Sequence, residues 1–289
     1  MSQRAVFVTG STGTVGAAVV QHLAASGTPV IAAVRARADP GDAPAAGVTP
    51  RTFDFGSTGA QLSAALEGTD RVFLMRPPAI EDVRRHLFPF IDAALGAGIR
   101  QIAFLSLQGV QANRKTPHHA VEEYLRQRRA PFTFLRPNFF MQNLSTAYVQ
   151  RIRERGEIFV PAGRSRTAFI DARDIGRVAA HVLTEPGHLR RAYTLSGEQS
   201  LSYRAVARIM SEVLGREIRY TRPTEKEFLA ALAAGGAPQD YLDVQKMIHR
   251  VVRLNVSALP NRTVRTLTGA PATTLREFVA GYRAEFSPR

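Results

Sequence analysis

Runs of apolar residues alternate with segments of helical periodicity through the first half of the chain. The apolar runs are nearly continuous in Val, Ile, Leu and Phe, which is typical of parallel strands covered on both faces. We expect strands within AVFVTG, PVIAAVR, RVFLM, QIAFLS and FTFLRP, and one more that ends just before Asp54. Helices are expected between them, over about 14–26, 60–67, 80–98 and 117–129. This rhythm predicts an α/β fold, a doubly wound parallel sheet with helices on both faces.

The rhythm breaks after about residue 143. A helix is expected over LSTAYVQRIRERG and a short strand near EIFVPAG, and the chain returns to the sheet over about 166–196. From SYRAVARIMSEVLG onward the pattern is mostly helical. We therefore expect a first domain over residues 1–150, completed by 166–196, and a smaller, mainly helical region over residues 197–289.

The composition is that of an ordinary globular protein apart from its charge. Hydrophobic residues make up 45% of the 289 residues and the net charge is +14. Such a charge formally admits nucleic acid or an anionic membrane surface as a partner. The basic residues are almost all arginines spread along the chain, with only three lysines. We interpret them as a solvated basic surface, and we expect neither nucleic acid nor membrane as a partner.

Several kinds of site are excluded or disfavoured. The chain has no cysteine, which excludes disulfides, thiolate metal sites and cysteine nucleophiles. No His or carboxylate cluster has the spacing of metal ligands, so no metal is expected. The first residues lack a signal-peptide pattern, and no apolar stretch approaches the roughly 20 residues of a membrane span. We expect a cytoplasmic protein.

Three glycines stand between the first strand and the first helix, in the sequence VTGSTGTVG. Glycines at such a turn let the backbone approach a pyrophosphate, and the N–H groups that start the helix face the anion. The strand before the turn, and the amphipathic helix and strand after it, are the setting of a Rossmann dinucleotide site; an ordinary glycine-rich turn is the alternative. We expect cofactor contacts from Gly10, Ser11, Thr12, Gly13, Thr14, Val15 and Gly16.

Arginines follow the second strand, where an acidic residue usually accepts a hydrogen bond from the adenosine ribose. Arg35 and Arg37 stand there instead. A guanidinium matches a 2′-phosphate in charge and geometry and has no anionic partner on a bare ribose. This favours NADP(H) over NAD(H), unless these arginines are simply exposed.

Further cofactor contacts are expected where the other strands end, because the carboxyl ends of parallel strands share one edge of a sheet. Asp54 could meet the adenine amino group or cap a helix that starts near Ser57. The remaining candidates are Phe55 beside it, Arg76 and Pro77 near the pyrophosphate and ribose, Ser106 near the nicotinamide, and Pro137, Asn138 and Phe139 after the sixth strand.

The sequence resembles the NmrA-like group of atypical short-chain dehydrogenases, which includes quinone and azo-compound reductases and redox-sensing regulators. The resemblance covers nearly the whole chain, and its segments are VTGSTGTVG, AVEEYLR, FTFLRPNFFMQNL, AFIDARDIGRVAAHVL, YTLSGEQSLSYRAVARIMSEVLGR and GAPATTLREF. It implies a Rossmann fold, a preference for NADP(H), and nicotinamide and substrate contacts at Asn138 and Phe139.

The proton donor of ordinary short-chain dehydrogenases is missing. These enzymes use Tyr-x-x-x-Lys, and no lysine of this chain lies four residues after a tyrosine. Matching AVEEYLR to the family's helix places Arg114 and His118 roughly at the two positions. His118 and His119 are the candidate general acids, although a histidine pair at a helix start is commonly a surface feature.

Three nearby carboxylates have structural interpretations. We expect Glu122 in the first turn of its helix, favoured by the helix dipole. Asp171 and Asp174 are expected at the start of another helix, as a cap and a first-turn acid.

Two functions remain open on these residues. The first is an NADP(H)-dependent oxidoreductase that transfers hydride to a small hydrophobic quinone-like, carbonyl, azo or imine compound, for example in secondary-metabolite tailoring. The second is a non-catalytic NADP(H) sensor that regulates a partner protein. Either a monomer or a homodimer is compatible with the sequence.

Overall fold

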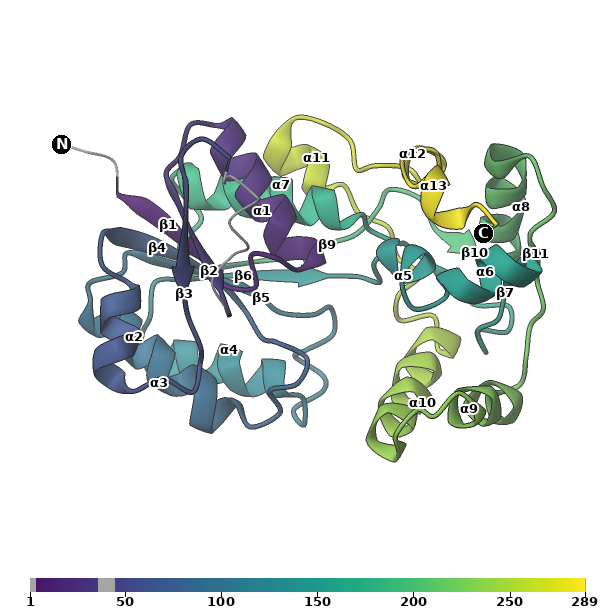
Figure 1. Cartoon of the computed structure of the whole chain (residues 1–289), viewed down its shortest axis with the longest axis horizontal. Helices are drawn as coiled ribbons and strands as arrows, with labels where there is room; N and C mark the ends of the chain where they lie inside the picture. The colour runs from purple at the N-terminus through teal and green to yellow at the C-terminus, as the bar shows by residue number, and fades with distance from the viewer. Residues whose placement is uncertain (1–3, 36–44, 289) are drawn as a thin grey trace. The chain divides into compact units, whose positions relative to one another are not determined.

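Seven parallel strands form the central sheet of a first structural unit (Figure 1). The computed structural model describes residues 4–35 and 45–288. They divide into unit 1 (Met1–Pro137, Ala172–Leu195 and Thr266–Gly269) and unit 2 (Asn138–Asp171, Ser196–Arg265 and Ala270–Arg289). The strands of the sheet, in spatial order, are β3 (Val48–Thr52), β2 (Val30–Val34), β1 (Ala5–Val8), β4 (Thr69–Met75), β5 (Gln101–Leu105), β6 (Phe132–Pro137) and β9 (Arg191–Leu195).

The strand order reverses direction at β1. Strand β2 pairs with one edge of β1 and β4 pairs with the other, both in parallel. In open α/β sheets, ligands bind outside the carboxyl ends of the strands at such a switch point. The doubly wound parallel sheet expected from the sequence is therefore confirmed, and it presents a switch point directly after β1.

Helices cover both faces of this sheet (Figure 1). Helices α1 (Thr14–Ala25) and α7 (Ala172–Thr184) lie on one face. Gly176 allows them to cross closely, because a Cβ at Gly176 would lie 2.6 Å from the Cβ of Ala18. The other face carries α2 (Gly59–Ala65), α3 (Val83–Gly96) and α4 (Pro117–Gln127). Between them and the sheet lies a core that includes the mutually packed rings of Phe7, Phe53, Phe55 and Phe90.

Local side-chain bonds explain where two of these helices begin. Pro117 is the first residue of α4, and the hydroxyl of Thr116 accepts a hydrogen bond from the His119 N–H at 3.2 Å. Helix α3 begins at Val83 rather than at Ile80 as the sequence predicted. The Asp82 side chain accepts from the Arg85 N–H at 3.1 Å, and this cap fixes the later start.

Unit 2 has its own apolar core and only short strands. Strand β8 (Arg166–Thr167) pairs with β10 (Leu201–Ser202), and β7 (Glu157–Ile158) pairs with β11 (Arg219–Tyr220). Buried residues that pack together in this core include Ile158, Met210 and Phe278. Its helices are α5 (Gln142–Ser145), α6 (Val149–Arg155), α8 (Tyr203–Leu214), α9 (Glu225–Ala234), α10 (Gln239–Arg253), α12 (Leu275–Gly281) and α13 (Arg283–Phe286), and α11 (Thr263–Thr268) spans the unit boundary.

One helix expected from the sequence is divided in two. The pattern of LSTAYVQRIRERG predicts a single helix, but α5 ends at Ser145 and α6 begins at Val149. Thr146 has φ −125° and ψ −84°, and its hydroxyl donates to the Gln142 carbonyl at 2.8 Å. The local side-chain bond competes with helix continuation.

Among the residues placed by the structure, no helix has the length and hydrophobicity that a bilayer crossing requires.

Candidate cofactor site

The loop after β1 is closed by glycines that no other residue could replace without a shift. The Gly13 N–H donates to the Gly10 carbonyl at 2.9 Å. A Cβ at Gly16 would lie 2.0 Å from that same carbonyl oxygen, and Gly10 itself has φ +61°. A side chain at either position would push the turn open. The loop therefore presents bare backbone at the switch point of the sheet.

Two hydroxyls fix this loop to its neighbouring strands. Ser11 Oγ donates to the Ala33 carbonyl of β2 at 2.6 Å. Thr9 Oγ1 accepts from the Met75 N–H at 2.7 Å and donates to the Phe73 carbonyl at 3.1 Å, both in β4. Thr9 is not among the residues expected from the sequence, where its only signal is a hydroxyl at the end of an apolar strand. These bonds hold the loop between β2 and β4.

The start of α1 suits an anion. Gly13 precedes the helix without a side-chain cap, and the first turn contains no acidic residue. The first N–H groups of a helix lack partners within it and carry partial positive charge. Thr12 and Thr14 are exposed, whereas Val15 is buried and anchors the helix to the core. The loop thus offers N–H donors to a phosphate and no competing carboxylate.

Arg35 is exposed directly after the carboxyl end of β2. The bond from Ser11 to Ala33 brings the glycine loop to the same end of that strand. Its exposed guanidinium has the charge and the planar donor geometry that bind a phosphate. Arg37 lies outside the described residues.

The turn after β3 holds Asp54 and Phe55 in different ways. Asp54 Oδ1 accepts from the Gly56 N–H at 2.6 Å, while the side chain stays exposed. Helix α2 begins after Thr58, so the alternative that Asp54 caps a helix near Ser57 is wrong. The Phe55 ring is buried against Phe53 at a centroid distance of 4.8 Å, which leaves only its backbone for a ligand.

Arg76 shapes the loop after β4. Its Nη1 donates to the carbonyls of Pro77 and Pro78, both at 3.1 Å, and of Ile80 at 2.6 Å. Its Nε is buried without a hydrogen-bond partner among the described residues, and burial lowers the pKa of Arg76. A buried donor without a partner is costly, and an acceptor on a bound cofactor would satisfy it. The bare glycine loop and this donor both fit a dinucleotide.

The loop after β5 leads to a buried ionic network. Ser106 Oγ donates to Glu122 Oε1 at 2.7 Å, and Arg136 donates to Glu122 through Nε at 2.9 Å and Nη2 at 2.5 Å. Arg126 adds a bond to Glu122 Oε2 at 2.9 Å. Burial acts to raise the pKa of Glu122, but the bonds from Arg136 and Ser106 and the nearby positive charges hold it below its ordinary value.

This network corrects one expectation. Glu122 does not stand in the first turn of its helix: it lies in the second turn of α4 with 1% of its surface exposed. Its carboxylate joins α4 to β6, and the Ser106 hydroxyl is already committed to it. Ser106 therefore offers no free proton at the edge of the sheet.

His118 and His119 stand at the start of α4 in different surroundings. The His118 ring lies 6.1 Å from the Phe104 centroid. Burial, and then the charge of Arg76, lower the pKa of His118 to about 4, which Glu122 only partly opposes. His119 Nδ1 lies 3.1 Å from the Val110 carbonyl oxygen. His118 is therefore neutral near pH 7, while Arg114 is exposed in the preceding loop.

The residues after β6 are engaged structurally. The Pro137 carbonyl accepts from the Gln108 N–H at 3.0 Å. Asn138 is buried in unit 2, donating through Nδ2 to the Ser257 carbonyl at 2.9 Å and accepting from the Phe139 N–H at 2.8 Å. The partly buried Phe139 packs against the unit 2 core.

The two aspartates near α7 also make structural bonds. Asp171 Oδ1 accepts from Gln142 Nε2 at 2.8 Å. Asp174 stands in the first turn of α7, as expected, and pairs with Arg177 at 2.7 Å.

Within the described ranges, no three His, Asp or Glu side chains come together in a way that could hold a metal.

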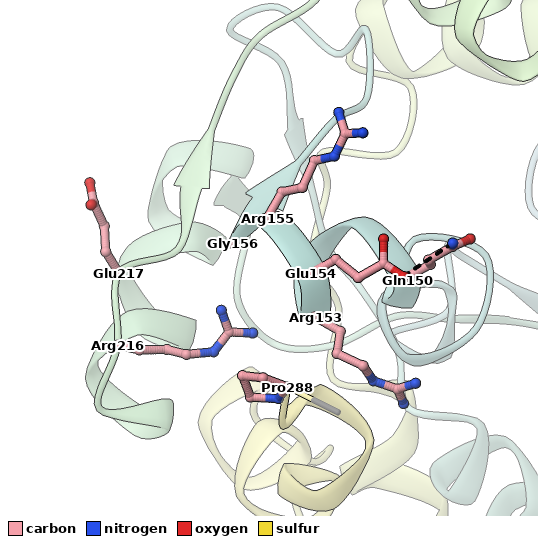
Figure 2. Close-up of a pocket in the computed structure, with 8 residues that line it drawn as sticks. All are labelled: Gln150, Arg153, Glu154, Arg155, Gly156, Arg216, Glu217 and Pro288. Atoms are coloured by element: carbon pink, nitrogen blue, oxygen red, sulfur yellow. Dashed lines mark hydrogen bonds between the residues drawn. The ribbon is translucent and has the colours of Figure 1, made fainter.

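A hollow of about 820 Å³ in unit 2 is lined by none of the expected site residues (Figure 2). Arg216 Nη2 reaches into it and donates to the Ile152 and Phe286 carbonyls at 2.8 and 2.9 Å. Figure 2 shows Arg155 and Glu217 extending away from Arg216 and Pro288. Arg216 therefore joins α6 to the C-terminal segment.

Comparisons with known proteins agree with this arrangement. The chain is 34% identical over 287 residues to an NAD(P)H azoreductase of Xenophilus azovorans, covering 97% of this chain and 99% of that protein. It is 27% identical to quinone oxidoreductase 2 of Escherichia coli (strain K12), covering 95% and 97%. The crystal structure of the E. coli NADPH-dependent quinone oxidoreductase QOR2 complexed with NADPH matches with a TM-score of 0.85 and 27% identity, covering 96% of this chain and 99% of that one.

A regulator shares the fold as well. The structure of NmrA, a negative transcriptional regulator, in complex with NADP matches with a TM-score of 0.77 at 18% identity, covering 96% of this chain and 95% of that one, a likeness of fold alone. The model of the NmrA-like family matches residues 2–258. The resemblance inferred from the sequence is thus confirmed, and this chain belongs to the NmrA-like family.

Proposed function

We propose that this chain is an NADP(H)-dependent oxidoreductase that reduces a small hydrophobic compound of the quinone, conjugated carbonyl, azo or imine class. The observation that carries the proposal is the closed glycine loop, together with the exposed Arg35 at the carboxyl end of β2. Relatives over nearly the whole chain are named as an azoreductase and a quinone oxidoreductase, which supports this substrate class.

The residues would hold the cofactor in the following way. The N–H groups at the start of α1 bind the pyrophosphate, Arg35 binds the 2′-phosphate, and the Arg76 Nε donates to a cofactor oxygen. The exposed Asp54 carboxylate is available to the adenine amino group. NADPH, when bound, supplies the hydride. In this proposal the substrate contacts come from unit 2, which contains the helical region. A cytoplasmic location is also a prediction.

The substrate class follows from the shortage of proton donors: of the two candidate general acids only His119 remains, and its Nδ1 lies 3.1 Å from the Val110 carbonyl oxygen. The chain lacks Tyr-x-x-x-Lys, Ser106 is bonded to Glu122, and His118 is neutral near pH 7. A ketone needs a proton delivered as hydride arrives, whereas a quinone-like acceptor forms a stabilised anion that takes its proton from water. The side chains at this edge of the sheet therefore suit acceptors of the second kind.

The test compares cofactors. Arg35→Ala is expected to raise the dissociation constant for NADPH about 10- to 100-fold, from the loss of charged hydrogen bonds, and to leave that for NADH unchanged. Fluorescence titration with both cofactors measures this, with the exposed Arg85→Ala on α3 as the matched control. Equal losses for both cofactors would remove Arg35 from the phosphate role.

Turnover is tested separately with a panel of quinones, azo dyes and polycyclic ketones. NADPH oxidation by the wild-type chain with at least one of them is the expected result. The alternative result is that the chain binds NADP(H) tightly, oxidises it with none of the compounds and binds a partner protein only when nucleotide is present. That result would contradict the reductase proposal and support the function of an NADP(H) sensor.

A further inference from the structure

The large apolar side chains that unit 2 exposes are concentrated on one short segment. Among the described residues, seven such side chains are at least 40% exposed. Six of them lie between residues 241 and 259, and the seventh is Leu189 in unit 1. Exposed apolar side chains that gather on one surface usually mark a binding site, so their arrangement on α10 matters. The six are Tyr241, Val244, Met247, Leu254, Val256 and Leu259.

Three of the six lie in a helix-pairing stripe along α10 and its C-cap. Val244, Met247 and Leu254, together with the partly buried Val251, follow one another at intervals of three, four and three residues, which places them on one side of the helix. The opposite side carries the buried His249 and Val252. One face of α10 thus packs into unit 2, with the His249 ring 4.8 Å from that of Phe228, and the other is exposed.

The exposed charges of α10 divide by sign along the helix. Asp240 and Asp243 lie in its first half, Lys246 is its middle residue, and Arg250 lies in its second half. None of these four forms an ion pair within the described part of the chain, whereas Arg253 pairs with Glu225 at 2.5 Å. A helix with this charge order attracts an antiparallel copy of itself, because each acidic half meets a basic half.

We propose that the α10 stripe is the contact between two copies of this chain. The helices pack antiparallel about a two-fold axis, so that Asp243 of each copy faces Arg250 of the other and every contact occurs twice. An acidic protein or an anionic lipid surface fits less well, because Asp240 and Asp243 would repel it. One helix pair is a small interface, so the dissociation constant is expected at roughly 1–100 µM.

Sedimentation velocity of the full chain across this concentration range tests the proposal. We expect a concentration-dependent species of twice the chain's mass, and Met247→Asp should weaken it by at least about tenfold. Leu189→Asp makes the same change at an exposed apolar side chain in unit 1 and should leave the dimer intact. A wild-type monomer throughout, or an unaffected dimer of Met247→Asp, would overturn the proposal.

A charge exchange tests the antiparallel arrangement without placing a charge in the apolar stripe. Asp243→Arg and Arg250→Asp should each weaken the dimer, and the double variant should restore it. Failure of the double variant to dimerise, with circular dichroism unchanged, would contradict the pairing. If the double variant dimerises like the wild type, the partner of the α10 stripe is a second copy of this chain.

Discussion

The glycine loop and the network around Glu122 stand near the same edge of the unit 1 sheet and are built in opposite ways. In the loop, the structure depends on side chains that are absent, since a Cβ at Gly16 would lie 2.0 Å from the Gly10 carbonyl oxygen. In the network, polar side chains are present, but Ser106, Arg136 and Arg126 all bond to one carboxylate. The glycine loop thus offers N–H donors to a phosphate, whereas in the network the polar groups are already bonded to Glu122 and few are free to move a proton.

The largest effect is expected from Gly16→Ala, which removes the property that defines the loop. The added methyl group cannot coexist with the Gly10 carbonyl, so the turn must open, at a cost of about 3 kcal/mol in the free energy of unfolding. NADPH affinity should fall by at least about 100-fold, because the N–H donors lose their arrangement. Thermal unfolding and fluorescence titration measure the two effects.

Gly59→Ala is the matched control for this substitution. Gly59 is the first residue of α2, and a Cβ there would meet nothing within 4 Å. Its replacement should leave NADPH binding unchanged and stabilise the chain by about 0.5 kcal/mol. If both alanine variants bind NADPH equally well, the loop is not the phosphate site.

Glu122→Gln is expected to have the next largest effect, this time on stability. The substitution leaves the buried Arg136 without its counter-charge, at a cost of about 3 kcal/mol, the lower end for such a pair because a hydrogen-bonding side chain is kept. The neighbouring Glu123→Gln alters an exposed pair with Arg126 and should change stability by less than about 0.5 kcal/mol. Urea unfolding of both variants gives the comparison.

The pH dependence sharpens this prediction. The pKa of Glu122 is below its ordinary value, so the ionised carboxylate contributes its stability above the unfolded pKa of about 4.3, and the contribution is lost as pH falls through the lowered folded pKa. The difference between wild type and Glu122→Gln should therefore be constant from pH 6 to 8 and shrink below about pH 4. A difference that grows on acidification would contradict the network.

The two regions also differ in how far the sequence predicts them. The glycine spacing is local, so VTGSTGTVG between a strand and a helix was enough to place the loop. The partners of Glu122 and Asn138 are not local: Arg136 is 14 residues away and Ser257 is 119 residues away. Such pairings depend on how α4 packs on β6 and how unit 2 folds, which periodicity does not encode. The burial of the Phe55 ring against Phe53 is likewise set by packing, so a contact of Phe55 with the cofactor stays a prediction for its backbone.

The smallest effect is expected from His118→Asn, and it decides whether the network region supplies a proton. With a pKa of about 4, only about one His118 in a thousand carries a proton at pH 7. The rate of NADPH-dependent reduction should therefore be independent of pH between 6 and 8, and His118→Asn should change it by less than about twofold. His86→Asn on α3 provides the matched control. If a general acid of ordinary pKa takes part, the wild-type rate should instead fall about tenfold per pH unit above 6.5. If His118→Asn loses that pH dependence and His86→Asn keeps it, His118 is the general acid.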